Sequence, residues 1–299
     1  MAAALVIGST TTPSVAADTV TVDATYSASL GGFTFASGTL HFTLIGNTYD
    51  AQINAGVTGI AALIASRTAI GGASGRVTPG RVLPQAYALS IAGGTVPNEV
   101  ALTFSDNRVT SVSASELHLA GWDQRIPLLP AHKLGVVDPF GAFVIPMQPG
   151  KNPMTPAVCN RTLKIFDGRV RYDLRLVYGA KTDVTASEPG SYSGPAIVCA
   201  VAYRPIAGHR ILSPEQQHFE NNIEFSIWFV PVGQTGVLLP HRVLIQTQSG
   251  MLLINATRFV VNGSDPIVAA NDAEPAKTHA WLKHRRHHRV EDEAPVNPN

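Results

Sequence analysis

Apolar and polar side chains alternate along residues 159–179, "CNRTLKIFDGRVRYDLRLVYG", on both sides of an Asp167-Gly168 pair. An Asp-Gly pair supplies the positive φ angles that a two-residue type I′ turn requires. Such a turn fixes the register of the two strands that it joins. The pattern therefore predicts a β-hairpin in which Phe166 lies opposite Arg169.

The predicted hairpin has one apolar and one charged face, because side chains along a strand alternate at period two. The apolar face holds Leu163, Ile165, Val170, Tyr172, Leu174 and Leu176. The charged face holds Lys164, Arg169, Arg171 and Arg175, with Asp173 among them. Like charges opposite each other are mildly destabilising, so this face is expected to be solvated or to meet an anionic partner. Half-buried antiparallel sheets favour the solvated interpretation, and the four basic residues remain candidate contacts for an anion.

Strand-like runs separated by glycine and proline turns continue along residues 18–262. The chain has 26 Gly and 21 Pro among 299 residues, and only 14% of its residues are charged. This profile is unlike that of a helical bundle or a disordered protein. It predicts a mainly β fold: one antiparallel β-barrel or β-spiral (a half-open barrel) with one or two short helices.

Three segments interrupt the β pattern. Residues 60–66 fit either a helical turn or a buried strand, and the β-rich surroundings favour a strand. Asp138 is a good N-cap and Pro139 suits the first helical position, so a short apolar helix is expected over residues 140–143. It would plug a barrel end or lie across a sheet. Residues 213–214, Ser-Pro, begin a second predicted short helix.

The two ends of the chain differ from the strand-rich middle. Residues 1–17 are interpreted as a partial signal peptide, because a short apolar run precedes the small residues Val15-Ala16-Ala17. No Lys or Arg precedes that run, and an ordinary flexible N-terminus is the alternative. Residues 263–299 are predicted to be a disordered, charged, histidine-rich tail. Its His284, His287 and His288 could hold a transition metal, but a solvated tail is favoured and no metal site is predicted.

Charge and hydropathy exclude two classes of partner. The formal net charge of +1 gives no support for a nucleic-acid partner. After the first residues there is no apolar stretch of about 18 residues, so no transmembrane helix is expected.

Cys159 and Cys199 are the two cysteines of the chain. In an exported protein an isolated pair most often forms a disulfide. Neither a Cys-x-x-Cys motif nor a zinc-ligand spacing offers a rival role. Both cysteines lie in strand-like runs, so the bond is expected to join two strands that flank the hairpin.

No motif in the sequence specifies a reaction. It lacks a Gly-x-Ser-x-Gly elbow, a phosphate loop, a dinucleotide fingerprint and a His-Glu-x-x-His motif. Single histidines are scattered over predicted strands and loops, where structural hydrogen bonding is their expected role: His41, His118, His132, His209, His218 and His241. No catalytic residue and no cofactor is therefore predicted, and the protein is expected not to be an enzyme.

The segment "VCNRTLKIFDGRVRYDLRL", followed by "YSGPAIVCAVAYRPIAGHR", resembles the alphaproteobacterial branch of the DUF 3108 family, whose domain has no known function. The resemblance covers roughly residues 40–262. It implies an exported cell-envelope protein of Gram-negative bacteria, located in the periplasm and built as an antiparallel β-barrel or spiral. It carries over no catalytic residue. Gly141-Ala142 stands where a Ser-Ala pair is common in the family.

Three functions are compatible with this sequence. The leading hypothesis is a non-catalytic periplasmic protein that binds a lipid or a peptide on the concave face of its sheet. The alternative is a structural or protein-interaction domain that docks an acidic envelope protein or anionic headgroups through the basic hairpin face. An envelope hydrolase is the third, and it would need a polar cleft with converging Asp, Glu or His side chains.

Overall fold

The computed structural model describes residues 18–63, 66–94, 98–115, 124–148, 152–211 and 224–262. The predicted signal peptide, the predicted helix at residues 213–214 and the predicted tail therefore lie outside the described residues. None of the helices within these ranges is long and apolar enough to cross a membrane.

Strands dominate the structure and belong to one 14-stranded sheet. They are β1 (Thr19–Leu30), β2 (Phe33–Ile45), β3 (Thr48–Val57), β4 (Thr68–Thr78), β5 (Arg81–Ala92), β6 (Asn98–Ser105), β7 (Arg108–Ala114), β8 (Ile145–Pro146), β9 (Arg161–Phe166), β10 (Arg171–Val184), β11 (Gly194–Ala207), β12 (Phe225–Pro231), β13 (Val237–Thr247) and β14 (Gly250–Asn262). The described helices are single 3₁₀ segments: η1 (Gly59–Leu63), η3 (Pro130–Lys133), η4 (Gly141–Phe143) and η5 (Pro156–Val158).

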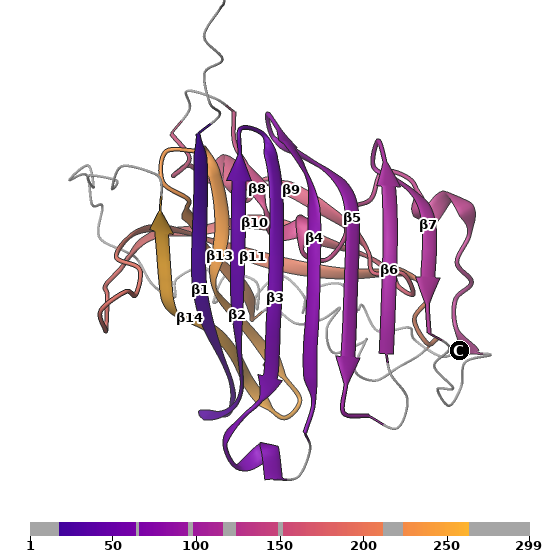
Figure 1. The fold of residues 1–299 in the computed structure, drawn as a ribbon, viewed down its shortest axis with the longest axis horizontal. Helices are drawn as coiled ribbons and strands as arrows, with labels where there is room; N and C mark the ends of the chain where they lie inside the picture. Colours follow the sequence, from indigo (N-terminus) through magenta and orange to yellow (C-terminus); the bar gives the residue numbers. More distant parts are fainter. Residues whose placement is uncertain are drawn as a thin grey trace, which may run out of the picture.

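The strand order explains how one sheet forms two layers. It runs β7-β6-β5-β4-β3-β2-β1-β14-β13-β12-β11-β10-β9, with β8 paired to β13 off this path. All of the pairings between strands are antiparallel. Strands β1–β7 form a front layer, and the sheet curls so that β9–β11 cross behind it (Figure 1). The predicted antiparallel, barrel-like fold is confirmed.

A short segment, residues 134–137, connects the two edges of the curled sheet. The Val136 N–H donates to the Asn107 carbonyl at 3.0 Å, in the turn between β6 and β7. On the other side, the Val137 N–H donates to the Lys164 carbonyl in β9 at 2.9 Å. The half-open barrel is thus bridged by a segment that hydrogen-bonds to both sides of the gap.

Two hydrophobic clusters fill the interior. The first contains buried residues of the front layer, such as Val22, Phe42 and Leu102. The second lies against the back layer and contains Ile165 and Ile197. The central segment that carries η4 contributes to both clusters, so it lies inside the curled sheet.

The predicted turn of the β9–β10 hairpin is wrong by one residue. The Asp167 N–H donates to the Val170 carbonyl at 3.2 Å, so the turn is centred on Gly168-Arg169, and Phe166 pairs with Arg171 instead of Arg169. The Asp167 carboxylate causes this shift, because Oδ1 accepts hydrogen bonds from the Arg169 and Val170 N–H groups at 2.8 and 2.6 Å. The register moves by two residues, which preserves the faces of the strands.

Of the two other predicted interruptions of the β pattern that can be compared with the structure, one is wrong and one is correct at its cap. Residues 59–63 form the 3₁₀ helix η1, so the favoured strand at residues 60–66 is wrong and the helical-turn alternative is correct. Gly59 has a φ of +64°, which turns the chain out of β3 before a strand can resume. The predicted cap at Asp138 is present, because its Oδ1 accepts hydrogen bonds from the Phe140 and Gly141 N–H groups at 2.9 and 2.7 Å. The helix itself is one 3₁₀ turn, η4.

The predicted disulfide joins Cys159 to Cys199 with an S–S distance of 2.00 Å. Cys199 lies in β11, but Cys159 follows η5 and precedes β9. The bond therefore ties a 3₁₀ turn to a strand instead of joining two strands. Both cysteines are fully buried in the second hydrophobic cluster.

Candidate functional site

An apolar cavity of about 430 Å³ lies inside the curled sheet. One wall comes from β1–β3, the opposite wall from β13 and β14, and the inner end from the segment that carries η4. Its lining residues include Tyr26, Ala28, Ala36, Gly38, Leu40, Ala51, Ile53, Ala55, Phe140, Phe143, Val144, Leu239, Pro240, Arg242, Val243 and Ile254. The volume is within the range of small-molecule binding sites, about 300–1,000 Å³.

The cavity exists because its front wall is made of small residues. Ala28 pairs with Ala36 across β1 and β2, and Gly38 pairs with Ala55 across β2 and β3. A β-carbon on Gly38 would come within 2.8 Å of the Ala55 β-carbon, so a larger residue does not fit there. Further along the same strands, large residues such as Leu44 and Tyr49 fill the interior. Side-chain size along β1–β3 thus decides where the barrel is filled and where it is hollow.

Two polar side chains on the strands that form the cavity have defined partners. The Tyr26 hydroxyl donates to the Pro240 carbonyl at 2.7 Å, which ties β1 to β13. The Arg242 Nε donates to the Asn255 Oδ1 at 2.8 Å, and its guanidinium carbon lies 5.6 Å from the ring centre of Trp228. The guanidinium is therefore held by a hydrogen bond and a cation–π contact.

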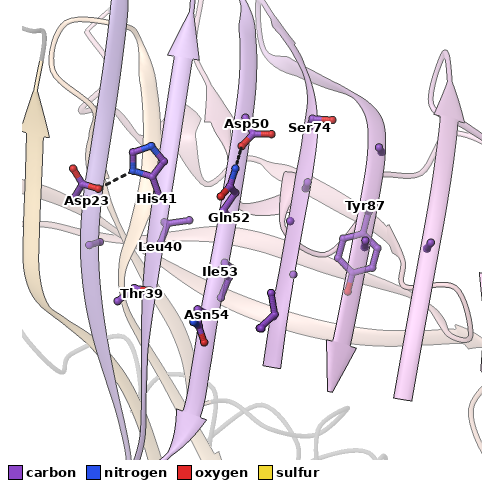
Figure 2. A pocket seen from close by; sticks show the side chains of 18 of the residues that line it. Asp23, Thr39, Leu40, His41, Asp50, Gln52, Ile53, Asn54, Ser74 and Tyr87 are labelled. Carbon is purple, nitrogen blue, oxygen red and sulfur yellow. Dashed lines mark hydrogen bonds and ion pairs between the residues drawn. The ribbon is translucent and has the colours of Figure 1, made fainter. Parts of the chain in front are cut away.

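A second hollow, a groove of about 900 Å³, lies on the outer face of β1–β6 (Figure 2). Its side chains alternate with the buried ones of the same strands, which places them on the solvent side. Small residues form part of its lining, namely Gly72, Ala86, Ala88 and Ala101, and polar residues add Asp23, His41, Asp50 and Gln52. This groove is open and carries polar side chains on a largely apolar lining, whereas the interior cavity is almost wholly apolar.

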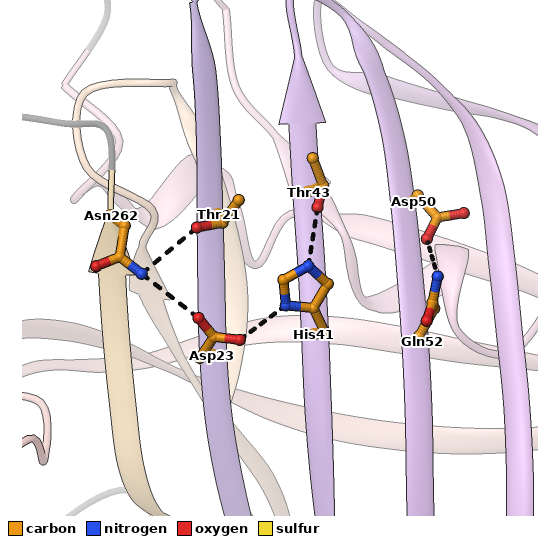
Figure 3. Close-up of polar contacts among 7 residues, drawn as sticks. All are labelled: Thr21, Asp23, His41, Thr43, Asp50, Gln52 and Asn262. Atoms are coloured by element: carbon orange, nitrogen blue, oxygen red, sulfur yellow. Dashed lines mark hydrogen bonds and ion pairs between the residues drawn. The ribbon is translucent and has the colours of Figure 1, made fainter.

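Asp23 and His41 of this groove form a hydrogen-bonded row with Thr43 (Figure 3). The Asp23 Oδ1 lies 2.7 Å from the His41 Nδ1, and the His41 Nε2 lies 3.3 Å from the Thr43 Oγ1. The Asn262 Nδ2 donates to the Asp23 Oδ2 at 3.4 Å. The order carboxylate, imidazole and hydroxyl is that of Ser-His-Asp hydrolases.

The sheet itself explains the row. Asp23 and His41 lie directly opposite each other in the β1–β2 register, where oppositely charged side chains commonly pair. Both side chains are about half exposed, at 49% and 50%. Thr43 is paired on both sides, with Thr21 and Asp50, so its backbone belongs to the sheet ladder and does not form an oxyanion hole. His41 thus fits the structural hydrogen-bonding role expected from the sequence.

The four candidate contacts for an anion do not share one surface. Lys164 and Arg175 are exposed on β9 and β10. Arg169 lies in the turn, where its Nη2 donates to the Glu99 and Ser115 carbonyls at 2.9 Å. Arg171 is buried and pairs with Asp173 at 2.6 Å. The prediction that Arg169 and Arg171 lie on a solvated charged face is therefore wrong. The shifted turn directs Arg169 to the Glu99 and Ser115 carbonyls, and Arg171 is buried in an ion pair with Asp173.

Asp138 is the buried acid of the interior. It is fully buried, and burial raises its pKa to about 6 despite the hydrogen bonds from Gly141 and Phe140. Among the described residues, neither its Oδ2 nor the buried Tyr49 hydroxyl has a hydrogen-bond partner. A β-carbon on Gly141 would lie 2.6 Å from each of these two oxygens. The sequence indicated the capping role of Asp138, but not the approach of Tyr49 from β3.

The chain is similar to a solved structure and matches a family model. The crystal structure of a β-barrel-like protein of the domain of unknown function DUF1849 from Brucella abortus is similar to it, with a TM-score of 0.44 and 10% identity over 81% of this chain and 98% of that one. No curated protein matches the chain. The family model described as "Protein of unknown function (DUF3108)" matches residues 25–256, which is most of the sequence. The chain therefore belongs to the DUF3108 family.

Proposed function

We propose that this protein is a non-catalytic, periplasmic lipid-binding protein of the cell envelope. The single observation that carries the proposal is the apolar cavity of about 430 Å³ inside the curled sheet. Each methylene group that leaves water for such a site contributes about 0.8 kcal/mol to the free energy of binding. Burial of an acyl chain in the cavity is therefore favourable.

The composition of the cavity wall favours a lipid over a peptide. A peptide brings backbone N–H and C=O groups, and burying them without hydrogen-bond partners is costly. The wall consists mainly of alanine, leucine, isoleucine, valine and phenylalanine side chains. The Tyr26 hydroxyl, one of its few polar groups, already donates to the Pro240 carbonyl. An acyl chain makes no such demand on the wall.

Two features support the proposed compartment. Disulfides persist in oxidising environments such as the periplasm, and Cys159 and Cys199 form one. A short apolar run followed by small residues before Asp18 is a pattern typical of secretory signal peptides.

The non-catalytic part of the proposal rests on the polar row of the outer face. Asp23, His41 and Thr43 are the described side chains in the order of a hydrolase triad, and the β1–β2 register accounts for them. The groove that Asp23 and His41 line is separated from the apolar cavity by the sheet itself.

The proposal is tested by filling the cavity. In Ala36→Phe the new ring would occupy the hollow, whereas in the matched control Ala88→Phe it would lie on the outer face, where Ala88 is exposed. A fluorescent polyene fatty acid is titrated into each purified protein. We expect saturable 1:1 binding to the unmodified protein and to Ala88→Phe, and a loss of at least about tenfold in affinity for Ala36→Phe.

Two results would overturn the proposal. One is the absence of saturable binding to the unmodified protein. The other is equal binding to Ala36→Phe, provided that the variant unfolds at the same temperature as the unmodified protein, because a filled cavity does not admit the probe.

A further inference from the structure

We propose that one end of the curled sheet docks on a lipid bilayer and is the entrance through which an acyl chain reaches the cavity. This inference rests on the proposed lipid binding and deepens it by assigning the surface that exchanges the ligand. Three connections form this end: the β1–β2 turn, the β13–β14 turn and the segment from β3 into η1. They lie together at the lower end of the molecule in Figure 1.

Backbone contacts hold the three connections against one another. The Gly31 N–H, in the β1–β2 turn, donates to the Met251 carbonyl of β14 at 3.0 Å. The Thr58 N–H, between β3 and η1, donates to the Phe35 carbonyl of β2 at 2.8 Å. The three connections therefore form one continuous surface, which is called the docking end below.

The docking end is built from uncharged parts of the chain. The chain passes through it in three runs, residues 24–40, 51–66 and 243–257, and none of these runs contains Asp, Glu, Lys, Arg or His. Surfaces that face water usually carry such residues. An uncharged end is suited to contact with a bilayer, because moving a charge out of water is costly.

Phe33 lies at the tip of the docking end. Its side chain is 82% exposed, the largest exposure of a large apolar side chain in the part of the chain that the structure describes. Contact with lipid would remove this apolar area from water, which is favourable. Exposed apolar groups of this kind mark sites of contact with membranes or other proteins.

The strand registers connect Phe33 to the cavity. Phe33 pairs with Leu30 of β1, and Leu30 pairs with Leu252 of β14. Two residues further along the same strands, Ala28 pairs with Ile254, and both line the cavity. Cross-strand partners share a face, as do residues two apart on a strand. An apolar row thus runs on the cavity face of the sheet from the cavity to Phe33.

Opposite charges flank the docking end. The Arg67 carbonyl accepts a hydrogen bond from the Val57 N–H at 3.0 Å, and the Glu224 carbonyl accepts one from the Gln246 N–H at 3.0 Å. One cationic and one anionic residue therefore lie beside the end. Docking is expected to depend on burial of apolar area and not on attraction to anionic lipid, so salt should weaken it little.

The experiment places a dye at the tip of the docking end. Cys159 and Cys199 are buried and bonded to each other, so one introduced cysteine can be labelled with a nitrobenzoxadiazole dye. Labelled Phe33→Cys is mixed with vesicles of phosphatidylcholine, with and without phosphatidylglycerol. The matched control is Ile45→Cys, because Ile45 is 50% exposed and ends the same strand, β2, at its other end.

We expect the emission of the dye at position 33 to rise and to shift to shorter wavelength on both kinds of vesicle, because the dye leaves water. The dye at position 45 should not respond.

Two serine variants test what Phe33 contributes. In vesicle flotation, Phe33→Ser should bind at least about tenfold more weakly than the unmodified protein, because a large apolar side chain is lost from the contact. Ile45→Ser should bind like the unmodified protein. Transfer of the fluorescent fatty acid from vesicles to Phe33→Ser should slow in proportion. Titration of the same fatty acid in solution should be unchanged in both variants, because neither residue lines the cavity.

Failure of the inference is distinguishable from failure of the proposed function. If the dyes at positions 33 and 45 respond alike, or if Phe33→Ser floats like the unmodified protein, the inference is wrong, although fatty acid binding in solution would still support the proposed function. If the unmodified protein is a dimer that Phe33→Ser converts to a monomer, and neither floats, this end joins two copies of the chain and the inference is wrong. If no fatty acid binds in solution, the proposed lipid binding is wrong, and the entrance with it.

Discussion

The Arg169 Nη2 donates a hydrogen bond to the Glu99 carbonyl at 2.9 Å, across a separation of 70 residues. The same nitrogen donates to the Ser115 carbonyl at 2.9 Å, so one guanidinium holds the start of β6 and the end of β7. A β-carbon on Gly168 would lie 2.6 Å from the Val100 Cγ1, which shows how closely the β9–β10 turn approaches β6. The turn thus closes the gap between the two edges of the curled sheet.

Arg169→Ala is expected to open this closure. The substitution leaves the Glu99 and Ser115 carbonyls without the hydrogen bond, and we expect the free energy of unfolding to fall by about 1–3 kcal/mol. Amide hydrogen exchange in β6 and β7 should accelerate, because their contact with the turn is lost. Arg175→Ala removes an exposed arginine of the same hairpin and should change stability by less than about 0.5 kcal/mol. Equal exchange rates in the two variants would contradict the assigned closure.

The disulfide is expected to be a major stabilising element. In the chain-entropy model, a bond that closes a loop of 40 residues contributes about 4 kcal/mol. Urea unfolding of Cys159→Ala/Cys199→Ala should show a loss of about this size relative to the oxidised protein. A reducing agent should have no effect on the double variant, which serves as its own control. Identical unfolding midpoints of the oxidised protein and the double variant would show that the bond does not stabilise the fold.

Asp138 is expected to make stability depend on pH. Burial raises its pKa from the ordinary 3.8 to about 6, so the folded protein holds the proton more tightly than the unfolded chain. The resulting stabilisation is fully present below about pH 4 and is lost as the pH rises through about 6, with a total of about 3 kcal/mol. Asp138→Asn keeps an oxygen for the Phe140 and Gly141 N–H groups and should flatten this dependence. Chemical unfolding between pH 4 and 7.5 measures the free energy of unfolding of the unmodified protein and of Asp138→Asn. If the two free energies changed with pH in parallel, Asp138 would not be the group responsible.

The polar row of the outer face is expected to lack hydrolytic reactivity. A fluorophosphonate probe labels an activated hydroxyl, and we expect no labelling of Thr43 because its backbone belongs to the sheet ladder on both sides. His41→Ala should cost less than about 1 kcal/mol of stability, since cross-strand pairs contribute roughly 0.2–1 kcal/mol. Labelling that is present in the unmodified protein and lost in Thr43→Ala would show that the row is catalytic.

Local rules account for the features that the sequence predicted correctly. Leu163, Ile165, Leu174 and Leu176 are buried on one face, as the period-two alternation of the pleated backbone requires. Asp138 caps the turn that follows it because the donors lie only two and three residues away. The disulfide followed from the cysteine count and the expected compartment. Each of these conclusions depends on neighbours in sequence or on composition.

The misplaced turn shows where local rules compete. Asp167 and Gly168 both favour a turn, and the sequence alone does not choose between a centre at Asp167-Gly168 and one at Gly168-Arg169. The carboxylate of Asp167 selects the second by accepting the Arg169 and Val170 N–H groups. This choice moves Arg169 from the predicted charged face to the gap between the sheet edges.

The sequence by itself determined the antiparallel β fold, the core faces of its strands and the disulfide partners, because pleat, turn chemistry and cysteine pairing are encoded in short patterns. Only the tertiary structure decided where the barrel is hollow. Ala36 and Ile254 are more than 200 residues apart, and they line one cavity because the sheet curls until β1 pairs with β14. That curl is a property of the whole sheet, and no local pattern of side chains specifies it.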